Sequence, residues 1–213
     1  MTKAEERKLK EQLRLQSMTS FERPFWENGI LVAGMDEVGR GPLAGPVVAA
    51  CVVMRKEPLI EGVKDSKKVS EHKRERLYDE IRANALAFGF GWEFQDVIDE
   101  INILEATKSA FAQAYNSMNC VCSDVFVDAV KNLKIDANQH PLIHGDAICY
   151  SIAAASILAK VERDRFMVRA AEKYPQYGFE RNKGYGTREH IEAIKKFGPC
   201  EIHRMSFIKN FIT

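Results

Sequence analysis

The sequence predicts an α/β fold, in which helices cover the faces of a mixed central β-sheet. Short apolar and β-branched segments, such as residues 31–36 and 47–54, are typical of buried strands. Longer segments with apolar residues at every third or fourth position lie between and after them, as expected for helices that pack on a sheet. With 213 residues, 46% of them hydrophobic and 29% charged, the chain has the composition of one globular domain.

The first 29 residues differ from the rest of the chain. Residues 3–18 are rich in charge, and Leu9 and Leu13 share one helical face, which predicts a helix of marginal stability. Pro24 and the Asn28-Gly29 pair then interrupt the chain. We therefore assign residues 1–29 to a partly helical N-terminal extension and residues 30–213 to the main domain.

The main domain combines strand and helix patterns. Strands are expected at 31–36, 47–54, 88–94, 125–128 and 141–144, and helices at 70–87, 101–118, 149–173 and 187–197. Ser70 and Thr187 suit N-cap positions, and Gly198-Pro199 ends the last helix. Residues 37–46 hold three glycines and two prolines, which indicates a loop with special backbone geometry.

Composition limits location and partners. The five cysteines are odd in number and have no C-x-x-C spacing, so they indicate reduced thiols and neither a disulfide framework nor a zinc site. No apolar run approaches the roughly 20 residues that a membrane-spanning helix requires, and the first residues contain no apolar leader. We expect a cytoplasmic monomer with no membrane partner.

Charge is unevenly distributed along the chain. The net charge is +1, but the segment from Lys160 to Thr213 contains 12 basic and seven acidic residues. A basic quarter beside an acidic body could bind a polyanion. A chance partition of charges between solvated helix faces explains the same numbers.

Four acidic residues stand at expected strand ends. Asp36 and Glu37 end the first strand, and Asp128 and Asp146 follow two later strands. Carboxylates are rarely buried unless they are paired or bind a metal, and an all-oxygen set suits Mg²⁺ or Mn²⁺. Two such ions can activate a water and stabilise the leaving oxygen of a phosphodiester. The alternative is that each acid is a cap or a surface charge.

Asp36 and Glu37 are adjacent at the end of the first expected strand. Adjacent residues of a strand point to opposite faces of the sheet. Asp36 and Glu37 can therefore share a metal only if the strand bulges or ends there, which the glycine-rich loop after them allows. We expect such an irregularity at this position.

The Gly39-Arg40-Gly41 loop offers backbone groups and a guanidinium to a ligand. Glycines let backbone atoms approach closely and arginine binds phosphate, although a turn between two strands also requires glycine. The absence of a Walker loop and of a dinucleotide fingerprint argues against an ATPase or a dehydrogenase. Tyr185, between glycines in a basic stretch, suits stacking on a sugar or base; a half-buried loop aromatic is the alternative.

Further basic residues are candidates for phosphate contacts, with a solvated charged face as the alternative for each. They are Lys67, Lys68, Lys160, Arg163, Lys183 and Arg204.

Five segments of the chain form a recognisable set. The first is Gly34-Met35-Asp36-Glu37-Val38-Gly39-Arg40-Gly41-Pro42-Leu43-Ala44-Gly45-Pro46-Val47-Val48-Ala49-Ala50. The others are Asp65-Ser66-Lys67-Lys68, Val127-Asp128, Gly145-Asp146 with 153–165, and Lys183-Gly184-Tyr185-Gly186-Thr187 with 203–207. In this order they resemble the motifs of bacterial ribonuclease HII, in the type 2 ribonuclease H family, and the resemblance runs from about residue 30 to 208.

The resemblance implies a ribonuclease H-like catalytic domain over residues 30–213 and an endoribonuclease activity. The implied substrates are RNA/DNA hybrids and duplex DNA with an embedded ribonucleotide, cut 5′ of the ribonucleotide to leave a 3′-hydroxyl and a 5′-phosphate. The implied catalytic and metal-binding residues, with Mn²⁺ or Mg²⁺, are Asp36, Glu37, Asp128 and Asp146. The implied substrate-binding residues are Gly39, Arg40 and Gly41 at the ribose 2′-hydroxyl, Tyr185 at the junction, and Lys67.

Two departures and two rival functions accompany this hypothesis. His144 stands where many relatives have lysine, which could add a pH dependence near neutrality, and we interpret Asp164 as an ion-pair partner of Arg163 or Arg165. A nucleic-acid-binding module without catalysis is one rival, and the presence of all four acids argues against it. Type 3 ribonuclease H is the other, but about 29 preceding residues are too few for the N-terminal domain usual in such proteins.

Overall fold

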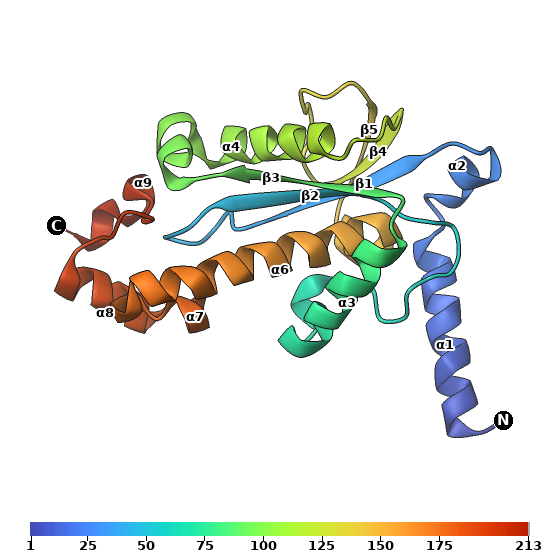
Figure 1. The fold of residues 1–213 in the computed structure, drawn as a ribbon, viewed down its shortest axis with the longest axis horizontal. Coiled ribbons are helices and arrows are strands. Elements are labelled where there is room, and N and C mark those ends of the chain that lie inside the picture. Colours follow the sequence, from blue (N-terminus) through green and yellow to red (C-terminus); the bar gives the residue numbers. More distant parts are fainter. Residues whose placement is uncertain (213) are drawn as a thin grey trace.

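A five-stranded mixed sheet organises the computed structural model, which describes residues 1–212 (Figure 1). The strand order is β3-β2-β1-β4-β5; β1 pairs with β2 and β2 with β3 in antiparallel fashion, whereas β1, β4 and β5 are parallel. The strands are β1 Val32–Val38, β2 Val47–Val53, β3 Ala87–Glu93, β4 Asp124–Asp128 and β5 Asn138–Leu142. The predicted mixed sheet is therefore confirmed.

Helices lie on both faces of this sheet, with α4 on one face and α6 and α3 on the other (Figure 1). The helices are α1 Lys3–Met18, α2 Arg23–Glu27, α3 Glu71–Asn84, α4 Gln95–Ser117, α5 Gly145–Ile148, α6 Tyr150–Lys173, α7 Phe179–Asn182, α8 Arg188–Phe197 and α9 Met205–Ile208. The described residues also form three short 3-10 helices: η1 Ser66–Lys68, η2 Pro175–Tyr177 and η3 Lys209–Phe211. Among the residues described, no helix is both long and apolar enough to cross a membrane.

The alternation of residues along β2 divides the core into two layers. Ala50 and Val52 pack toward α6 and α3, whereas Ala49, Cys51 and Val53 pack toward α4. All seven residues of β2 are buried, because both of its faces are covered. Its continuous apolar run is therefore the pattern of a doubly covered central strand.

Helix α6 lies unusually close to β1. A Cβ built on Gly34 would stand 2.2 Å from the carbonyl carbon of Ser151, so the helix backbone occupies the space of a side chain. The small residues that follow in α6, among them Ala153, Ala154 and Ala155, are fully buried. This close packing positions the first turns of α6 directly against the strand that carries Asp36.

Two elements differ from the sequence-based expectation. The fifth strand occupies 138–142 and not 141–144; Ile143 is 76% exposed and His144 adopts a left-handed φ of 56°. Among the described residues this edge strand pairs with β4 alone. Its five residues, which include Pro141, are exposed or half-buried, so they show no apolar strand pattern in the sequence. Helix α4 begins at Gln95 rather than 101 and is kinked at Asn102, where φ is 70°.

The N-terminal segment joins the core through its second half. Leu15 and Met18 of α1 are buried, and Phe21 and Phe25 pack against Phe126 of β4. The first turns of α1 project away from the sheet (Figure 1), and Leu9 and Leu13 are exposed there. The division into residues 1–29 and 30–213 stays a prediction.

Candidate active site

Three of the predicted acids meet at one end of the sheet. Asp36 of β1, Asp128 of β4 and Asp146 of α5 each offer a carboxylate oxygen, and these oxygens lie within 4.8 Å of one another. The parallel register places Met35 of β1 opposite Val127 of β4, so the residue after each one emerges at the same sheet edge.

A short turn brings in the third acid. His144 in its left-handed conformation turns the chain from β5 into α5, and Asp146 lies in the first turn of that helix. The backbone N–H of Gly145 donates a 2.8 Å hydrogen bond to Oδ1 of Asp128. A Cβ on Gly145 would stand 2.5 Å from Cδ1 of Ile152, so a larger residue there would require the Ile152 side chain to move.

The carboxylates repel one another in a partly dry environment. Burial, followed by the charges of Glu37 and Asp128, raises the pKa of Asp36 well above its usual range. Burial also raises the pKa of Glu37, where the charge of Asp128 adds to the effect. The pKa of Asp146 is raised by burial and by the charges of Asp65 and Asp128. The site thus holds more negative charge than its own protein groups neutralise.

Glu37 is not among the three acids whose carboxylate oxygens gather within 4.8 Å of one another. Strand β1 continues in regular register through Val38, with Asp36 opposite Ala50 and Glu37 opposite Ala49, so the predicted bulge or strand end is wrong. Oε1 of Glu37 lies 3.4 Å from the guanidinium of Arg40. Oε2 is buried and has no hydrogen-bond partner in the described part of the chain.

These observations fit a divalent cation. The donor set consists of carboxylate oxygens, the ligands that Mg²⁺ and Mn²⁺ prefer. The buried Oε2 of Glu37 is an orphaned polar atom beside the cluster, and a cation would offset both its desolvation and the mutual repulsion. The residues present are therefore suited to hold such an ion.

Two further residues, Ser156 and Asp65, lie near the acid cluster. The sequence did not single out either of them as a site residue. The hydroxyl of Ser156 on α6 acts to lower the pKa of Asp36, against the larger effect of burial, and it lies 2.8 Å from the hydroxyl of Ser66. Asp65 contributes its charge to the raised pKa of Asp146. Both residues lie inside the matched segments, but no spacing pattern distinguishes them from caps, and Asp65 does accept a hydrogen bond from the N–H of Lys67.

Two buried arginines hold the loop after β1. Arg204 donates to the carbonyls of Gly39, Arg40 and Gly45 at 2.6 to 3.0 Å. Arg163 donates to the carbonyls of Pro46, Ala44 and Lys183 at 2.9 to 3.0 Å. Both side chains are fully buried, so neither of the two alternatives considered for them, a phosphate contact or a solvated charged face, is correct. Every residue has a backbone carbonyl, so no residue type in the sequence marks these carbonyls as partners of an arginine. The role of Arg163 and Arg204 in holding the loop could therefore not be predicted.

The two glycines of the loop have different surroundings. Gly39 has a φ of +95°, and a Cβ there would stand 2.3 Å from Nε of Arg163. Gly41 has no positive φ, and no atom of the described residues lies within 4 Å of a Cβ built on it. The fold therefore requires glycine at position 39. At position 41 the fold does not require it, and the space beside the backbone is open to a ligand.

Arg40 and Tyr185 present side chains on the surface near this loop. Arg40 is exposed, and its only ion pair in the described chain is with Glu37. Tyr185 is 41% exposed, with its ring centroid 5.8 Å from the guanidinium carbon of Arg163. The N–H of Leu43 donates to the carbonyl of Gly184 at 2.8 Å, which joins the two loops.

The remaining basic candidates divide into two groups. Nζ of Lys67 lies 3.8 Å from Oδ2 of Asp146 with most of its side chain exposed; burial alone would lower its pKa, but the surrounding carboxylates raise it. Lys160 is instead partnered by Asp164, and Lys68 by Asp65 at 3.5 Å. Lys183 donates to the carbonyl of Glu180 at 2.7 Å.

Asp164 forms ion pairs, but not with the expected residues. Its partners are Lys160 and Arg74, the latter at 3.6 Å, and not Arg163 or Arg165. Arg163 is turned into the loop, and Arg165 contacts Glu75 of α3. Neighbours in sequence on a helix point in different directions, which is why the adjacent arginines were the wrong choice.

Solved structures with the same fold define the class of this protein. It is similar to ribonuclease H2 from Pyrococcus horikoshii OT3, with a TM-score of 0.73 and 27% identity over 85% of this chain and 97% of that chain. It is also similar to RNase HII in the PCNA:RNase HII complex from Archaeoglobus fulgidus, with a TM-score of 0.72, 28% identity and the same coverage. Together with the carboxylate cluster, this is the ribonuclease H fold of metal-dependent endonucleases.

Sequence comparison narrows the class to one family. The family model Ribonuclease HII matches residues 33–210, and the chain belongs to this family, whose members cleave the RNA of RNA/DNA hybrids. Ribonuclease HII of Ruminiclostridium cellulolyticum is 53% identical over 95% of this chain and 80% of its own length. Ribonuclease HII of Clostridioides difficile is 50% identical with the same coverage.

Proposed function

We propose that this ribonuclease HII-family enzyme cuts duplex DNA on the 5′ side of a single embedded ribonucleotide, as well as RNA/DNA hybrids, and leaves a 3′-hydroxyl and a 5′-phosphate. One observation carries the proposal: the acid cluster lies beside a rigid loop with open space at Gly41. The ribose 2′-hydroxyl is the group that distinguishes RNA from DNA at one position. Backbone groups without side-chain bulk can contact it.

In this proposal Asp36, Glu37, Asp128 and Asp146 hold Mg²⁺ or Mn²⁺. When bound, such ions activate the attacking water and stabilise the leaving oxygen of the phosphodiester. The protein's part is to hold four oxygen donors on β1, β4 and α5, which are rigid elements of the fold. The hydrogen bond from Gly145 to Asp128 fixes the orientation of that carboxylate.

The loop residues bind and orient the substrate. The backbone at Gly39 and Gly41 contacts the ribose 2′-hydroxyl, and the exposed Arg40 contacts the adjacent phosphate. The half-exposed ring of Tyr185 packs on the next sugar, where a second 2′-hydroxyl would alter the fit. Lys67, exposed beside Asp146, contacts a phosphate near the cleaved bond.

A cytoplasmic location and a monomeric state are part of the same proposal. All five cysteines are free thiols, and Cys51, Cys122 and Cys149 are buried, as suits a reducing compartment. Size-exclusion chromatography with light scattering tests the monomer, because a dimer would elute at twice the chain's 24.2 kDa.

The decisive experiment uses an end-labelled DNA duplex with one ribonucleotide, beside an all-DNA duplex, a uniform RNA/DNA hybrid and an EDTA control. Mg²⁺ and Mn²⁺ are tested separately. We expect a single cut 5′ of the ribonucleotide, only with metal, and product ends that a DNA polymerase can extend. Cleavage of the hybrid alone would contradict the proposed single-ribonucleotide activity.

A further inference from the structure

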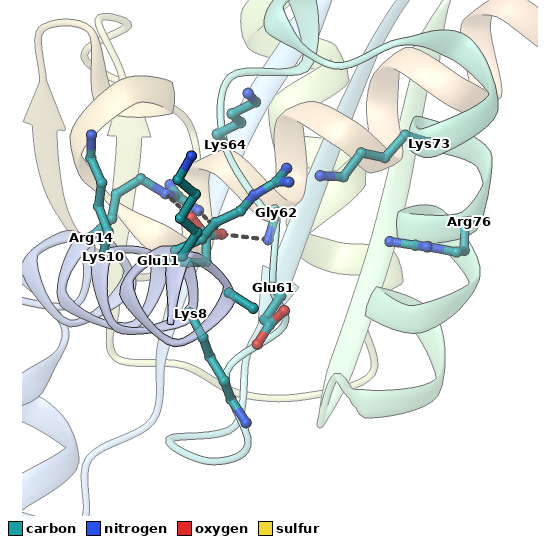
Figure 2. A pocket seen from close by; sticks show the side chains of 12 residues that line it. Lys8, Lys10, Glu11, Arg14, Glu61, Gly62, Lys64, Lys73 and Arg76 are labelled. Carbon is teal, nitrogen blue, oxygen red and sulfur yellow. Dashed lines mark hydrogen bonds and ion pairs between the residues drawn. The ribbon is translucent and has the colours of Figure 1, made fainter. Parts of the chain in front are cut away.

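A basic groove lies outside the candidate active site. Between α1, residues 61–64 and α3 the surface encloses a space of about 1030 Å³ (Figure 2). Its lining contains eight basic side chains and only two carboxylates. The basic residues are Lys3, Arg7, Lys8, Lys10, Arg14, Lys64, Lys73 and Arg76, and the acidic ones are Glu11 and Glu61.

The helix contributes its cations from one face. Lys3, Arg7, Lys10 and Arg14 follow one another at intervals of four, three and four residues, which places them on a single stripe of α1. Figure 2 shows Lys73 and Arg76 of α3 on the opposite side of the groove. The stripe extends over about 17 Å at 1.5 Å per residue. The two walls of the groove are therefore both positive.

Specific contacts hold α1 in this position. Oε1 of Glu11 accepts a 2.8 Å hydrogen bond from the N–H of Gly62 and lies 2.7 Å from the guanidinium of Arg14. Arg14 also donates to the carbonyl of Val63 at 2.9 Å. Below them Leu15 and Met18 are buried in the core. The groove is thus a fixed feature of the fold. The carboxylate of Glu11 is already occupied by Gly62 and Arg14 and does not neutralise the other cations of the groove.

Most of the groove's cations have no internal counter-charge. Arg14 is paired with Glu11, and Arg76 with Glu80 at 3.3 Å. Within residues 1–212, the other six have no carboxylate oxygen within 4.0 Å; they are Lys3, Arg7, Lys8, Lys10, Lys64 and Lys73. Such a concentration of like charge attracts a polyanion and is stabilised by it.

We infer that this groove binds the sugar-phosphate backbone of the duplex at a distance from the cleaved bond; the inference rests on the proposed function. A duplex carries one negative charge per roughly 1.7 Å of its axis, so the 17 Å stripe matches about five base pairs. Such an extended, open row of cations suits a polymer, whereas a small anion would engage only two or three of them.

The groove and the candidate active site are connected. Helix α1 packs against α5, whose first turn carries Asp146. Residues 61–64 of the groove continue directly into η1, where Lys67 lies 3.8 Å from that same Asp146. The family model begins at residue 33, so α1 adds this surface from outside the matched region. A duplex held at the acids can therefore extend along α1.

The test compares two double variants that each remove two exposed positive charges. Arg7→Gln/Lys10→Gln changes the groove, and Lys195→Gln/Lys196→Gln on α8 is the matched control at the opposite end of the molecule (Figure 1). Thermal unfolding first verifies that both variants are folded. Duplex binding is then measured by fluorescence anisotropy in EDTA across a range of salt concentrations, and cleavage is measured separately with Mg²⁺.

We expect the groove variant to bind a duplex of about 30 base pairs on the order of tenfold more weakly at about 0.1 M salt. Its log–log salt slope should fall by about 2, because each lost phosphate contact removes about 0.9. The control should change the affinity less than twofold. A short duplex that ends near the cleavage site should bind both variants alike.

The other outcomes overturn the inference. Equal loss in both variants would mean a general effect of net charge, and no change in the groove variant would mean that the duplex does not reach α1. A wild-type protein that binds no duplex in EDTA would also overturn it. By contrast, wild-type binding with a groove-dependent salt slope but no cut at the ribonucleotide would overturn the proposed function and leave the groove supported.

Discussion

The carboxylate of Glu22 accepts a 2.7 Å hydrogen bond from the backbone N–H of Ser151, so a residue of the N-terminal segment caps helix α6. The same oxygen accepts from the thiol of Cys149. Cys149 itself, the N-cap residue, makes no side-chain capping bond. A negative charge at this end also favours the helix dipole. Glu22 thereby stabilises the helix that supplies Ser156 to the acid cluster.

Replacement of this cap should be costly. Glu22→Ala leaves the N–H of Ser151 without an acceptor in a fully buried place, so we expect the free energy of unfolding to fall by about 2–4 kcal/mol. Urea denaturation measures the change. Glu27→Ala, in the exposed end of α2, is the control and should change stability by less than about 0.5 kcal/mol. Equal effects of the two substitutions would show that Glu22 is no cap.

Removal of one charge from the acid cluster should separate stability from activity. Asp128→Asn keeps the oxygen that accepts from Gly145 but relieves repulsion with Asp36 and Glu37. We expect the metal-free variant to be more stable by about 1 kcal/mol, and cleavage to fall about a thousandfold or more.

Metal titration provides the matching control for this variant. Mg²⁺ or Mn²⁺ should raise the melting temperature of the wild type, and Asp128→Asn should lose most of that shift. Asp124→Asn, on the same strand but paired with His140 at 2.8 Å, should keep it. An active, folded Asp128→Asn enzyme would contradict the assignment of the site.

The two loop glycines should respond in opposite ways. At Gly41 an added methyl group meets no atom of residues 1–212, so Gly41→Ala should change the free energy of unfolding by less than about 0.5 kcal/mol. The methyl group would occupy the space proposed for the ribose, and we expect kcat/KM at a single ribonucleotide to fall on the order of tenfold or more. Gly39→Ala should instead destabilise by about 2–4 kcal/mol, through its positive φ and its collision with Arg163. Chemical denaturation measures the stability of both variants, and steady-state kinetics measures their kcat/KM. A Gly41→Ala variant that loses as much stability as Gly39→Ala, or that keeps full activity, would contradict the prediction.

A directional chain of hydrogen bonds links two buried histidines to the Tyr185 loop. The N–H of Cys200 donates to Nδ1 of His203, the two Nε2 atoms of His203 and His190 lie 3.0 Å apart, and Nδ1 of His190 lies 2.9 Å from the carbonyl of Tyr185. This chain is complete when both rings are neutral, with His203 donating to His190. Burial and the neighbouring His190 lower the pKa of His203 to about 4, and burial lowers that of His190.

Acid should therefore weaken the fold. Unfolded His203 takes up a proton near its ordinary pKa of 6.5, whereas the folded residue does so only near 4, so protons favour the unfolded state between these values. Stability is complete above pH 6.5 and should fall by on the order of 3 kcal/mol by pH 4. Comparison of His203→Gln with wild type across this window isolates the effect from the carboxylates. The exposed His72→Gln is the control, and an unchanged slope in His203→Gln would contradict the prediction.

The acids at the strand ends could be predicted because a short apolar run followed by an acid is visible in the sequence. One example is the buried strand Val125-Phe126-Val127, which is followed by Asp128. The parallel pairing of β1 with β4 then places Asp128 beside Asp36. The resemblance supplied the roles proposed for Glu37 and Tyr185, which their spacing alone left open. It also correctly indicated the fold of the sheet and its flanking helices.

The misses share a physical cause. Arg163 and Arg204 bind backbone carbonyls, which every residue possesses and which no sequence pattern marks. Strand β5 is an edge strand whose pairing depends on β4 and not on its own side chains. The groove along α1 combines residues 3–14 with residues 61–76, so its charge is invisible when the chain is divided into consecutive segments.

Arg163 bonds to the carbonyls of both Ala44 and Lys183, and so it joins the loop of Gly39-Arg40-Gly41 to the loop of Tyr185. The two surfaces proposed to read a ribonucleotide and its neighbouring sugar are thereby mounted on one frame. Under the proposed function, the fixed distance between these two surfaces would select junctions that already match it. Little conformational entropy would then be lost on binding.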